Sequence, residues 1–195
     1  MTKTFSLTYD YLCPFAAGAN QAVLAAVEAG ADWQVRFVPF SLAATKVGED
    51  ERPVWERPSG AAGTSGVAAH QWALAVRELE PAAFRDFHAR VFAARHREGR
   101  DINDQVMLRT IATASGVDAA AVAAFVDSGS AAEILGIEHM GAVARWQVFG
   151  VPTFIHGNQA VFVRLMDYTL EDVERVLQML EWSNLNEFKR TSIPR

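Results

Sequence analysis

Cys13 is the strongest candidate for chemistry in this chain, which has 195 residues and a single cysteine. Pro14 follows it directly, and a proline suits the first turn of a helix because its missing N–H is not needed there. The sulfur would then lie at a helix N-terminus, where free backbone N–H groups and the helix dipole stabilise a thiolate. We therefore expect Cys13 to have a lowered pKa and to be mostly ionised at neutral pH.

A single cysteine can also be no more than a small buried apolar side chain. The residues around Cys13 favour chemistry over that alternative. Phe5, Leu7 and Tyr9 alternate with polar residues, which is the period of a β-strand, and residues 15–28 form an Ala-rich helical pattern. A strand that delivers Cys-Pro onto the start of a helix is uncommon, so Cys13 is predicted to be functional.

A second motif, residues 150–154 with the sequence Gly-Val-Pro-Thr-Phe, lies far downstream. Together with the strand, Cys13 and the helix, it resembles the DsbA-like branch of the thioredoxin superfamily, which includes DsbA- and FrnE-like oxidoreductases. In that branch a Cys-x-x-Cys follows the first strand, and a cis-proline before a later strand faces the sulfur. The resemblance implies that Cys13 is catalytic and that the Val151–Pro152 peptide bond is cis. It also implies that a substrate would contact Pro14, Phe15, Ala16, Val151 and Pro152.

Ala16 stands where the second cysteine of such a site would be. In a dithiol site that second thiol resolves the mixed disulfide by intramolecular attack, whereas here an external thiol must do so. The prediction is a monothiol thiol–disulfide oxidoreductase or low-molecular-weight-thiol transferase. Its partners are a small thiol and a disulfide or electrophilic substrate. Glutathione or an equivalent thiol is the implied cosubstrate, and no covalently bound cofactor is expected.

Two alternatives remain open. The related kappa-class glutathione transferases and 2-hydroxychromene-2-carboxylate isomerases share this fold, usually carry serine at the position of Cys13, and use glutathione itself as the thiol. By that resemblance the chain would be a thiol-cofactor-dependent isomerase or transferase acting on a small aromatic electrophile. The other alternative is a non-catalytic binding module in which Cys13 is vestigial, and the missing cysteine at Ala16 is its sequence hint.

The predicted fold class is α/β, a thioredoxin-like fold with a central mixed four-stranded sheet and an inserted all-helical subdomain. The thioredoxin-like domain is assigned to residues 1–45 and 130–190, and the insert to residues 64–129. A strand is predicted over residues 33–40, parallel to the first and at the sheet edge because Pro39 cannot donate to a ladder. Residues 67–127 carry helical patterns, and residues 153–156 and 159–165 are predicted to form a hairpin.

Four helix starts are predicted from capping residues. Asn103 and Asp118 each precede an apolar helical pattern. Residues 130–133 match a capping box, with Ser130 as the cap, and so do residues 169–172, with Thr169 as the cap.

Composition excludes several functional classes. The net charge of −5, with no basic stripe, argues against a nucleic-acid partner. No apolar run approaches the ~20 residues of a membrane span, so no membrane partner is expected. A single cysteine allows no internal disulfide, which favours a cytoplasmic location. The sequence leaves the oligomeric state open.

Other candidate residues have two interpretations each. The histidines have no spacing that makes a metal site with Cys13, so no metal is expected. His139 could shuttle protons near the active site, or it could be a surface or capping residue. Trp55, in the loop of residues 48–66, could belong to a lid or interface, or it could anchor that loop to the core. Aromatic residues that could line an apolar pocket, or equally well belong to the core, are Tyr11, Phe15, Phe40 and Trp146.

Overall fold

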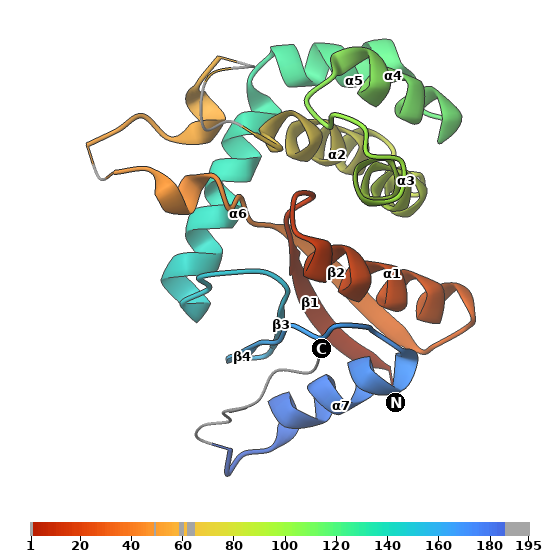
Figure 1. The fold of residues 1–195 in the computed structure, drawn as a ribbon, viewed down its shortest axis with the longest axis vertical. Coiled ribbons are helices and arrows are strands. Elements are labelled where there is room, and N and C mark those ends of the chain that lie inside the picture. Colours follow the sequence, from red (N-terminus) through yellow and green to blue (C-terminus); the bar gives the residue numbers. More distant parts are fainter. Residues whose placement is uncertain (1, 49, 59–60, 62–64, 186–195) are drawn as a thin grey trace.

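The computed structural model describes residues 2–48, 50–58, 61 and 65–185, and its centre is a mixed sheet (Figure 1). Its strands are β1 (Lys3–Tyr9), β2 (Trp33–Pro39), β3 (Thr153–His156) and β4 (Gln159–Phe162), in the order β2-β1-β3-β4. β1 pairs in parallel with β2 and antiparallel with β3, and β3 pairs antiparallel with β4. The mixed four-stranded sheet and the edge position of β2 confirm the sequence prediction.

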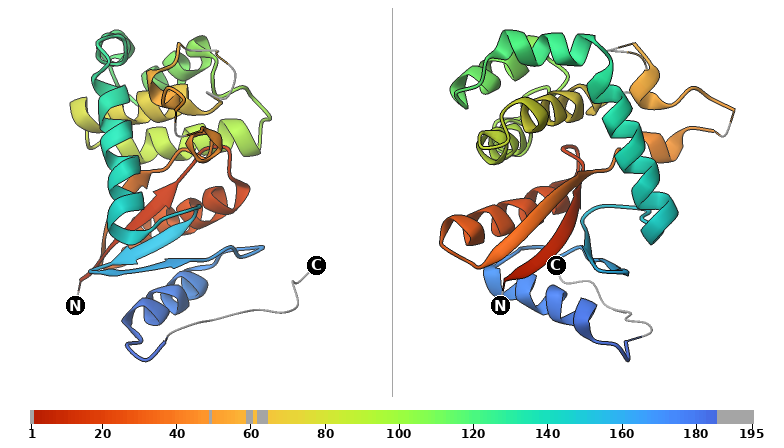
Figure 2. Two further views of the ribbon diagram at one scale, coloured as in Figure 1. Left: turned by 90° about the vertical axis from the view of Figure 1, so that its left-hand side faces the viewer. Right: turned by 180° about the vertical axis from the view of Figure 1, so that it is seen from behind.

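Helices cover both faces of this sheet (Figures 1 and 2). α1 (Pro14–Glu28) and α7 (Leu170–Glu181) contact each other, and they pack against β1 and against the β3–β4 hairpin respectively. α6 (Ser130–Trp146) lies over the other face. Its Glu138 pairs with Arg36 of β2, and Arg36 is the register partner of Ser6, which alternates with the buried Phe5 and Leu7. The sheet therefore has an apolar face under α1 and a more polar face under α6.

A group of helices lies beyond the C-terminal ends of the parallel strands β1 and β2, and Cys13 follows β1 at this end (Figure 1). These helices are α2 (Val67–Leu79), α3 (Phe84–His96), α4 (Gln105–Ala114) and α5 (Ala119–Asp127). Two short 3-10 turns, η1 (Ala44–Lys46) and η2 (Val54–Glu56), lie in the connection from β2 to α2. α3 contacts α1, so the helical group packs directly against the helix whose N-cap is Cys13.

The structure corrects two of the predicted helix caps. Asp104, not Asn103, caps α4, because the Asn103 side-chain oxygen instead accepts the Gly66 N–H at 2.9 Å. Gly129, with a positive φ of 85°, is the N-cap of α6, which leaves Ser130 inside the first turn. The predicted caps at Asp118 and at Thr169, with its capping box to Asp172, are confirmed.

The second strand of the hairpin is shorter than predicted, ending at Phe162 rather than at residue 165. The Tyr168 hydroxyl donates to the Val163 carbonyl at 2.7 Å and accepts the Leu165 N–H at 3.2 Å. The Val163 N–H still donates to the Pro152 carbonyl at 3.3 Å, but the Val163 carbonyl and the Leu165 N–H bond to Tyr168 and not to a neighbouring strand. Residues 186–190 of the predicted thioredoxin-like domain lie outside the described residues.

In the described part of the chain, no single helix is long and apolar enough to cross a membrane. The pair α5 and α6 meets that criterion only jointly, by length and composition, with a bend of 69° at the break.

Candidate active site

Cys13 occupies the N-cap position of α1, with extended backbone angles (φ −90°, ψ 116°) and Pro14 in the first turn. Its side chain is 7% exposed. The sulfur donates to the Val151 carbonyl oxygen at 3.5 Å, across 138 residues of sequence. The peptide bond between Val151 and Pro152, expected to be cis, is cis in the structure. Cys13 and the Val151–Pro152 loop therefore face each other, although the two motifs are distant in the chain.

The protonation state of Cys13 differs from the sequence expectation. Burial raises the pKa of the thiol above its ordinary value, and the Asp10 carboxyl group adds to that rise. The backbone N–H groups of Ala16 and Phe15, at the start of α1, lower the pKa, and so does Arg164, but burial outweighs them. The expectation of a lowered pKa was wrong because desolvation of the charged form dominates the helix N-terminus. At neutral pH Cys13 is therefore a thiol, which agrees with its S–H donation to Val151.

Asp10 holds the loop before Cys13 in place. This fully buried side chain accepts the Leu12 N–H at 2.8 Å and the Leu42 N–H at 2.6 Å, one with each oxygen. Its own carbonyl accepts the Cys13 N–H at 3.0 Å. Asp10 therefore joins the Cys13 loop to the segment after β2. The one sequence signal for this role is the position of Asp10, three residues before Cys13.

A chain of hydrogen bonds runs beneath this loop from Tyr11 to α1. The Asn20 amide nitrogen donates to the Ala16 carbonyl at 2.7 Å, so its oxygen is left to accept from His88 Nε2 at 2.9 Å. His88 Nδ1 then accepts the Tyr11 hydroxyl at 2.7 Å. Burial, followed by the neighbouring His70, lowers the pKa of His88 to about 3. His88 is therefore a neutral ring that links two parts of the site, and no local sequence pattern predicts it.

The contacts of His139 and Trp55 decide between the two interpretations of each residue. His139 is buried, and its Nδ1 accepts the Ser41 N–H at 3.2 Å. Burial lowers the pKa of His139 to about 4, which leaves the ring neutral and fixed between Phe40 and Trp55, at centroid distances of 4.4 and 5.2 Å. A surface position for His139 was therefore wrong. Trp55 is half-buried and packs against a second apolar cluster that includes Leu74 and Leu135, so it anchors its loop, which is one of the two interpretations proposed.

The outer side of the Cys13 loop carries aromatic side chains from the two loops that face each other at the sulfur, Phe15 two residues after Cys13 and Phe149 two residues before Val151. Phe15 is half-buried, and Phe149 is 70% exposed. The ring of Phe149 packs on that of Phe162, with centroids 4.8 Å apart. Phe162 lies so close to Gly150 that a β-carbon there would be 3.0 Å from the ring, which explains the glycine before Val151.

The other predicted contact residues differ in what they expose. Pro14 is exposed, whereas Ala16 is fully buried and can reach the sulfur only through its backbone N–H. Val151 and Pro152 are both buried as whole residues. In the described residues, the Val151 N–H has no hydrogen-bond partner. Of the suggested pocket aromatics only Phe15 lies beside Cys13, because Tyr11 and Phe40 are core residues.

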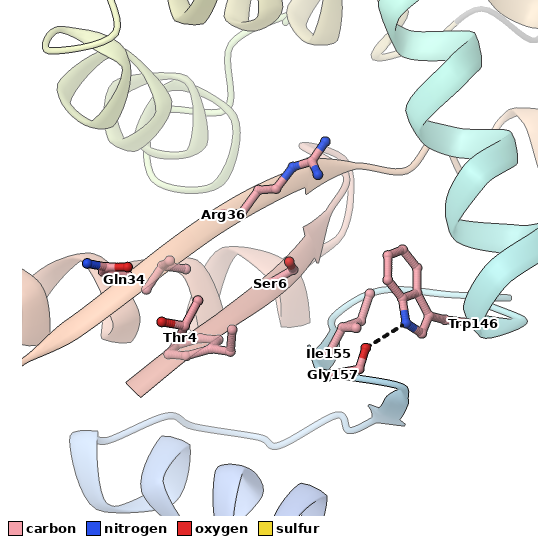
Figure 3. A pocket seen from close by; sticks show the side chains of 9 residues that line it. Thr4, Ser6, Gln34, Arg36, Trp146, Ile155 and Gly157 are labelled. Atoms are coloured by element: carbon pink, nitrogen blue, oxygen red, sulfur yellow. Dashed lines mark hydrogen bonds between the residues drawn. The ribbon is translucent and has the colours of Figure 1, made fainter. Parts of the chain in front are cut away.

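Trp146 belongs to a different cavity, of about 390 Å³, on the polar face of the sheet (Figure 3). Its indole N–H donates to the Gly157 carbonyl, and Thr4, Ser6 and Arg36 line the same cavity. Cys13 is not among the lining residues. Within the described ranges no group of three or more His, Cys, Asp or Glu side chains could hold a metal ion.

The comparison with protein families gives one match, to the DSBA-like thioredoxin domain, over residues 5–171 of this chain. This range includes Cys13, the Val151–Pro152 loop and all the helices from α1 to α6. No curated protein matches the chain in sequence.

Solved structures share the fold at low sequence identity. 2-Hydroxychromene-2-carboxylate isomerase is 19% identical with a TM-score of 0.66, and the match covers 91% of this chain and 94% of that one. DsbA of Pseudomonas aeruginosa is 18% identical with a TM-score of 0.60, covering 91% and 81%. A thioredoxin-like oxidoreductase from Silicibacter pomeroyi DSS-3 is 16% identical with a TM-score of 0.61, covering 90% and 84%. The fold is therefore thioredoxin-like with the helical insert.

Proposed function

The chain belongs to the family of DSBA-like thioredoxin domains, and on that premise we propose that it is a thiol–disulfide oxidoreductase or low-molecular-weight-thiol transferase working through Cys13 alone. The observation that carries this proposal is the position of the sulfur, at the start of α1 and 3.5 Å from the Val151 carbonyl before Pro152. Because this is the chain's single cysteine, we place the activity in a reducing cytoplasm.

The reaction is a thiol–disulfide exchange. Cys13 loses its proton and attacks one sulfur of the substrate disulfide, whose S–S bond breaks as the mixed disulfide forms. The departing thiolate takes up a proton, so the sulfur of Cys13 is oxidised and the departing sulfur is reduced. With Ala16 in place of a second cysteine, a free small thiol must attack the mixed disulfide and regenerate Cys13.

The residues beside Cys13 suit a small thiol or its disulfide as substrate. The Val151 N–H, which has no partner in the described residues, can donate to a backbone-like carbonyl of a substrate lying over the sulfur. Phe15 gives an apolar contact next to it. Glutathione, which carries amide groups around its thiol, has the chemistry to use both.

A specific observation supports a second function. The Cys13 S–H is a hydrogen-bond donor at neutral pH, since burial raises the pKa of the thiol. A donor at this position could stabilise the thiolate of a bound small thiol instead of reacting itself. The chain would then be a thiol-dependent isomerase or transferase for a small aromatic electrophile, and Phe15, Phe149 and Phe162 would suit an aromatic ring.

Intact mass after exposure to oxidised glutathione tests the first function. We expect one glutathionyl group on Cys13, and none in Cys13→Ser. Because the pKa is raised, the rate should climb about tenfold per pH unit between pH 7 and 8, without levelling off below the ordinary thiol pKa of ~8.5. No adduct even at pH 9, together with equal glutathione binding by wild type and Cys13→Ser in calorimetry, would favour the second function. Neither adduct nor thiol binding would leave a non-catalytic binding module.

Ala16→Cys provides a separate test of the scaffold. Positions 13 and 16 are one helical turn apart, within reach of a disulfide. We expect an internal disulfide, seen as a loss of free thiol, and faster reduction of a protein disulfide than with wild type. The buried site of Ala16 makes some repacking necessary. A disulfide that forms without any gain in turnover would favour the thiol-dependent transferase.

A further inference from the structure

Arg164 has an unusual environment for a surface arginine. It follows β4 and is exposed, and its guanidinium carbon lies 5.4 Å from the ring centroid of Phe15 and 5.2 Å from that of Phe162. No carboxylate of the described residues forms an ion pair with it. The nearest in sequence, Asp167, instead accepts the Tyr168 N–H at 2.9 Å. Arg164 therefore lies against aromatic rings, and the described residues supply it with no counter-charge.

The two rings place this cation beside the sulfur. Phe15 follows Cys13 by two residues, and Phe162 packs against Gly150 of the Val151–Pro152 loop. A guanidinium stacked on rings keeps its N–H groups free for an acceptor that lies in the guanidinium plane. Two of these N–H groups can donate side by side to the two oxygens of a carboxylate. Arg164 is also close enough to act electrostatically on the Cys13 thiol. The outer side of the site thus combines one sulfur, two rings and one cation that forms no ion pair within the described part of the chain.

We propose that Arg164 is a specificity-determining residue that binds a carboxylate of the substrate while Cys13 reacts with its sulfur. The substrate class is a small disulfide, or a small thiol, that carries a carboxylate group. This inference rests on the proposed function and deepens it. The bonds that form and break are those of the exchange described above, and Arg164 takes no part in them.

Three small disulfides that differ in charge test the inference. Dithiodipropionate carries carboxylates, hydroxyethyl disulfide is neutral and cystamine carries ammonium groups. The rate of adduct formation on Cys13 is measured by intact mass at pH 8 and low salt. Wild type should react in the order anionic, neutral, cationic, and the preference should weaken at high salt because exposed charges are screened.

Arg164→Gln should lower the ratio of the dithiodipropionate rate to the hydroxyethyl disulfide rate about fivefold, the effect of an exposed charge-assisted contact. Taking the ratio removes any change in the nucleophilicity of Cys13. Arg164→Lys should retain part of the preference, because it keeps the charge but loses the fork. Arg145→Gln is the matched control, since Arg145 also stacks on a ring, Trp146 at 4.6 Å, and should leave the ratio unchanged.

An unchanged ratio in Arg164→Gln, with adducts forming normally, would overturn the inference and leave the proposed function standing. If no disulfide forms an adduct, the proposed function fails, and calorimetry with dithiodipropionate decides the inference separately. Binding to wild type that is weakened in Arg164→Gln would support it. No binding to wild type, or equal binding to both proteins, would overturn it.

Discussion

The two sides of the Cys13 loop differ in the burial of their polar groups. On the inner side Asp10, Tyr11 and His88 are buried, and each makes at least one side-chain hydrogen bond shorter than 3 Å. On the outer side Phe149 and Arg164 are exposed, and the cation has no ion-pair partner among the described residues. The inner side fixes the position of the sulfur, whereas the outer side keeps its contacts available for a ligand.

This difference assigns separate consequences to substitutions that are only a few residues apart. Removing an inner group leaves a buried partner without a hydrogen bond, which costs stability. Removing an outer group changes a surface that already faces solvent, so stability should hardly change while reactivity does. Substitutions on the two sides test that separation.

Asp10→Ala should have the largest effect. It leaves the N–H groups of Leu12 and Leu42 without acceptors inside the protein, so we expect a loss of about 3 kcal/mol or more in the free energy of unfolding. Urea unfolding measures this loss. Asp167→Ala, on the outer side, is the matched control and should change stability by less than about 0.5 kcal/mol. Equal effects of the two substitutions would remove the distinction between the sides.

Mild acid should destabilise the inner side next. The pKa of His88 is lowered to about 3 and that of His139 to about 4, so both bind a proton more readily when unfolded. Their contribution is present above the unfolded pKa of ~6.5 and is lost as the pH falls below it, by about 1.4 kcal/mol per pH unit for each histidine. Urea midpoints at pH 7 and 5 measure the slope. His88→Leu should reduce the slope, whereas the exposed His156→Gln should not, and a flat profile would contradict the prediction.

Tyr11→Phe should have an intermediate effect. It removes the hydroxyl that His88 Nδ1 accepts and leaves that nitrogen buried without a donor, at a cost of about 1–2 kcal/mol in unfolding free energy. Urea unfolding at pH 7 measures this cost. The phenyl ring keeps the packing of Tyr11 on Phe92, so a loss much larger than this would mean that packing, not the hydrogen bond, had changed.

Phe149→Ala should have the smallest effect on stability, within about 0.5 kcal/mol, because the ring is 70% exposed. It should still slow the reaction of Cys13 with an aromatic disulfide, about twofold relative to hydroxyethyl disulfide, since one ring contact is worth only about 0.5 kcal/mol. Stopped-flow absorbance of the released aromatic thiol measures this ratio. A large loss of stability would place Phe149 with the inner residues instead.

Local sequence patterns predicted much of the fold and the position of the sulfur. The alternation of Phe5, Leu7 and Tyr9, the Cys-Pro junction and the Thr169 capping box depend on neighbours in sequence, and each is found in the structure. The predicted caps at Asn103 and Ser130 were wrong, the first because of a tertiary contact and the second because of the backbone conformation of the residue before it. Gly66 takes the Asn103 oxygen, and Gly129 adopts a positive φ that ends the preceding turn.

The surroundings of the sulfur could not be predicted in the same way. The pKa of Cys13 depends on burial by segments from both ends of the chain, and burial outweighs the local helix start. The bonds of Asp10 to Leu42, and of Tyr11 to His88, join residues that are 32 and 77 positions apart. Arg164 carried no signal at all in sequence, because its meaning comes from the absence of a nearby carboxylate among the described residues.

Because the protein has a single thiol, the reactivity of that thiol can be followed without a label. Cys13 is the one cysteine in the sequence and is only 7% exposed, so every thiol-specific reagent reports on one atom. Because so little of Cys13 is exposed, a bulky reagent should modify it more slowly than a small one at the same pH. The ratio of the two modification rates therefore measures how much access the surrounding structure gives to the sulfur in solution, with no label or engineered probe.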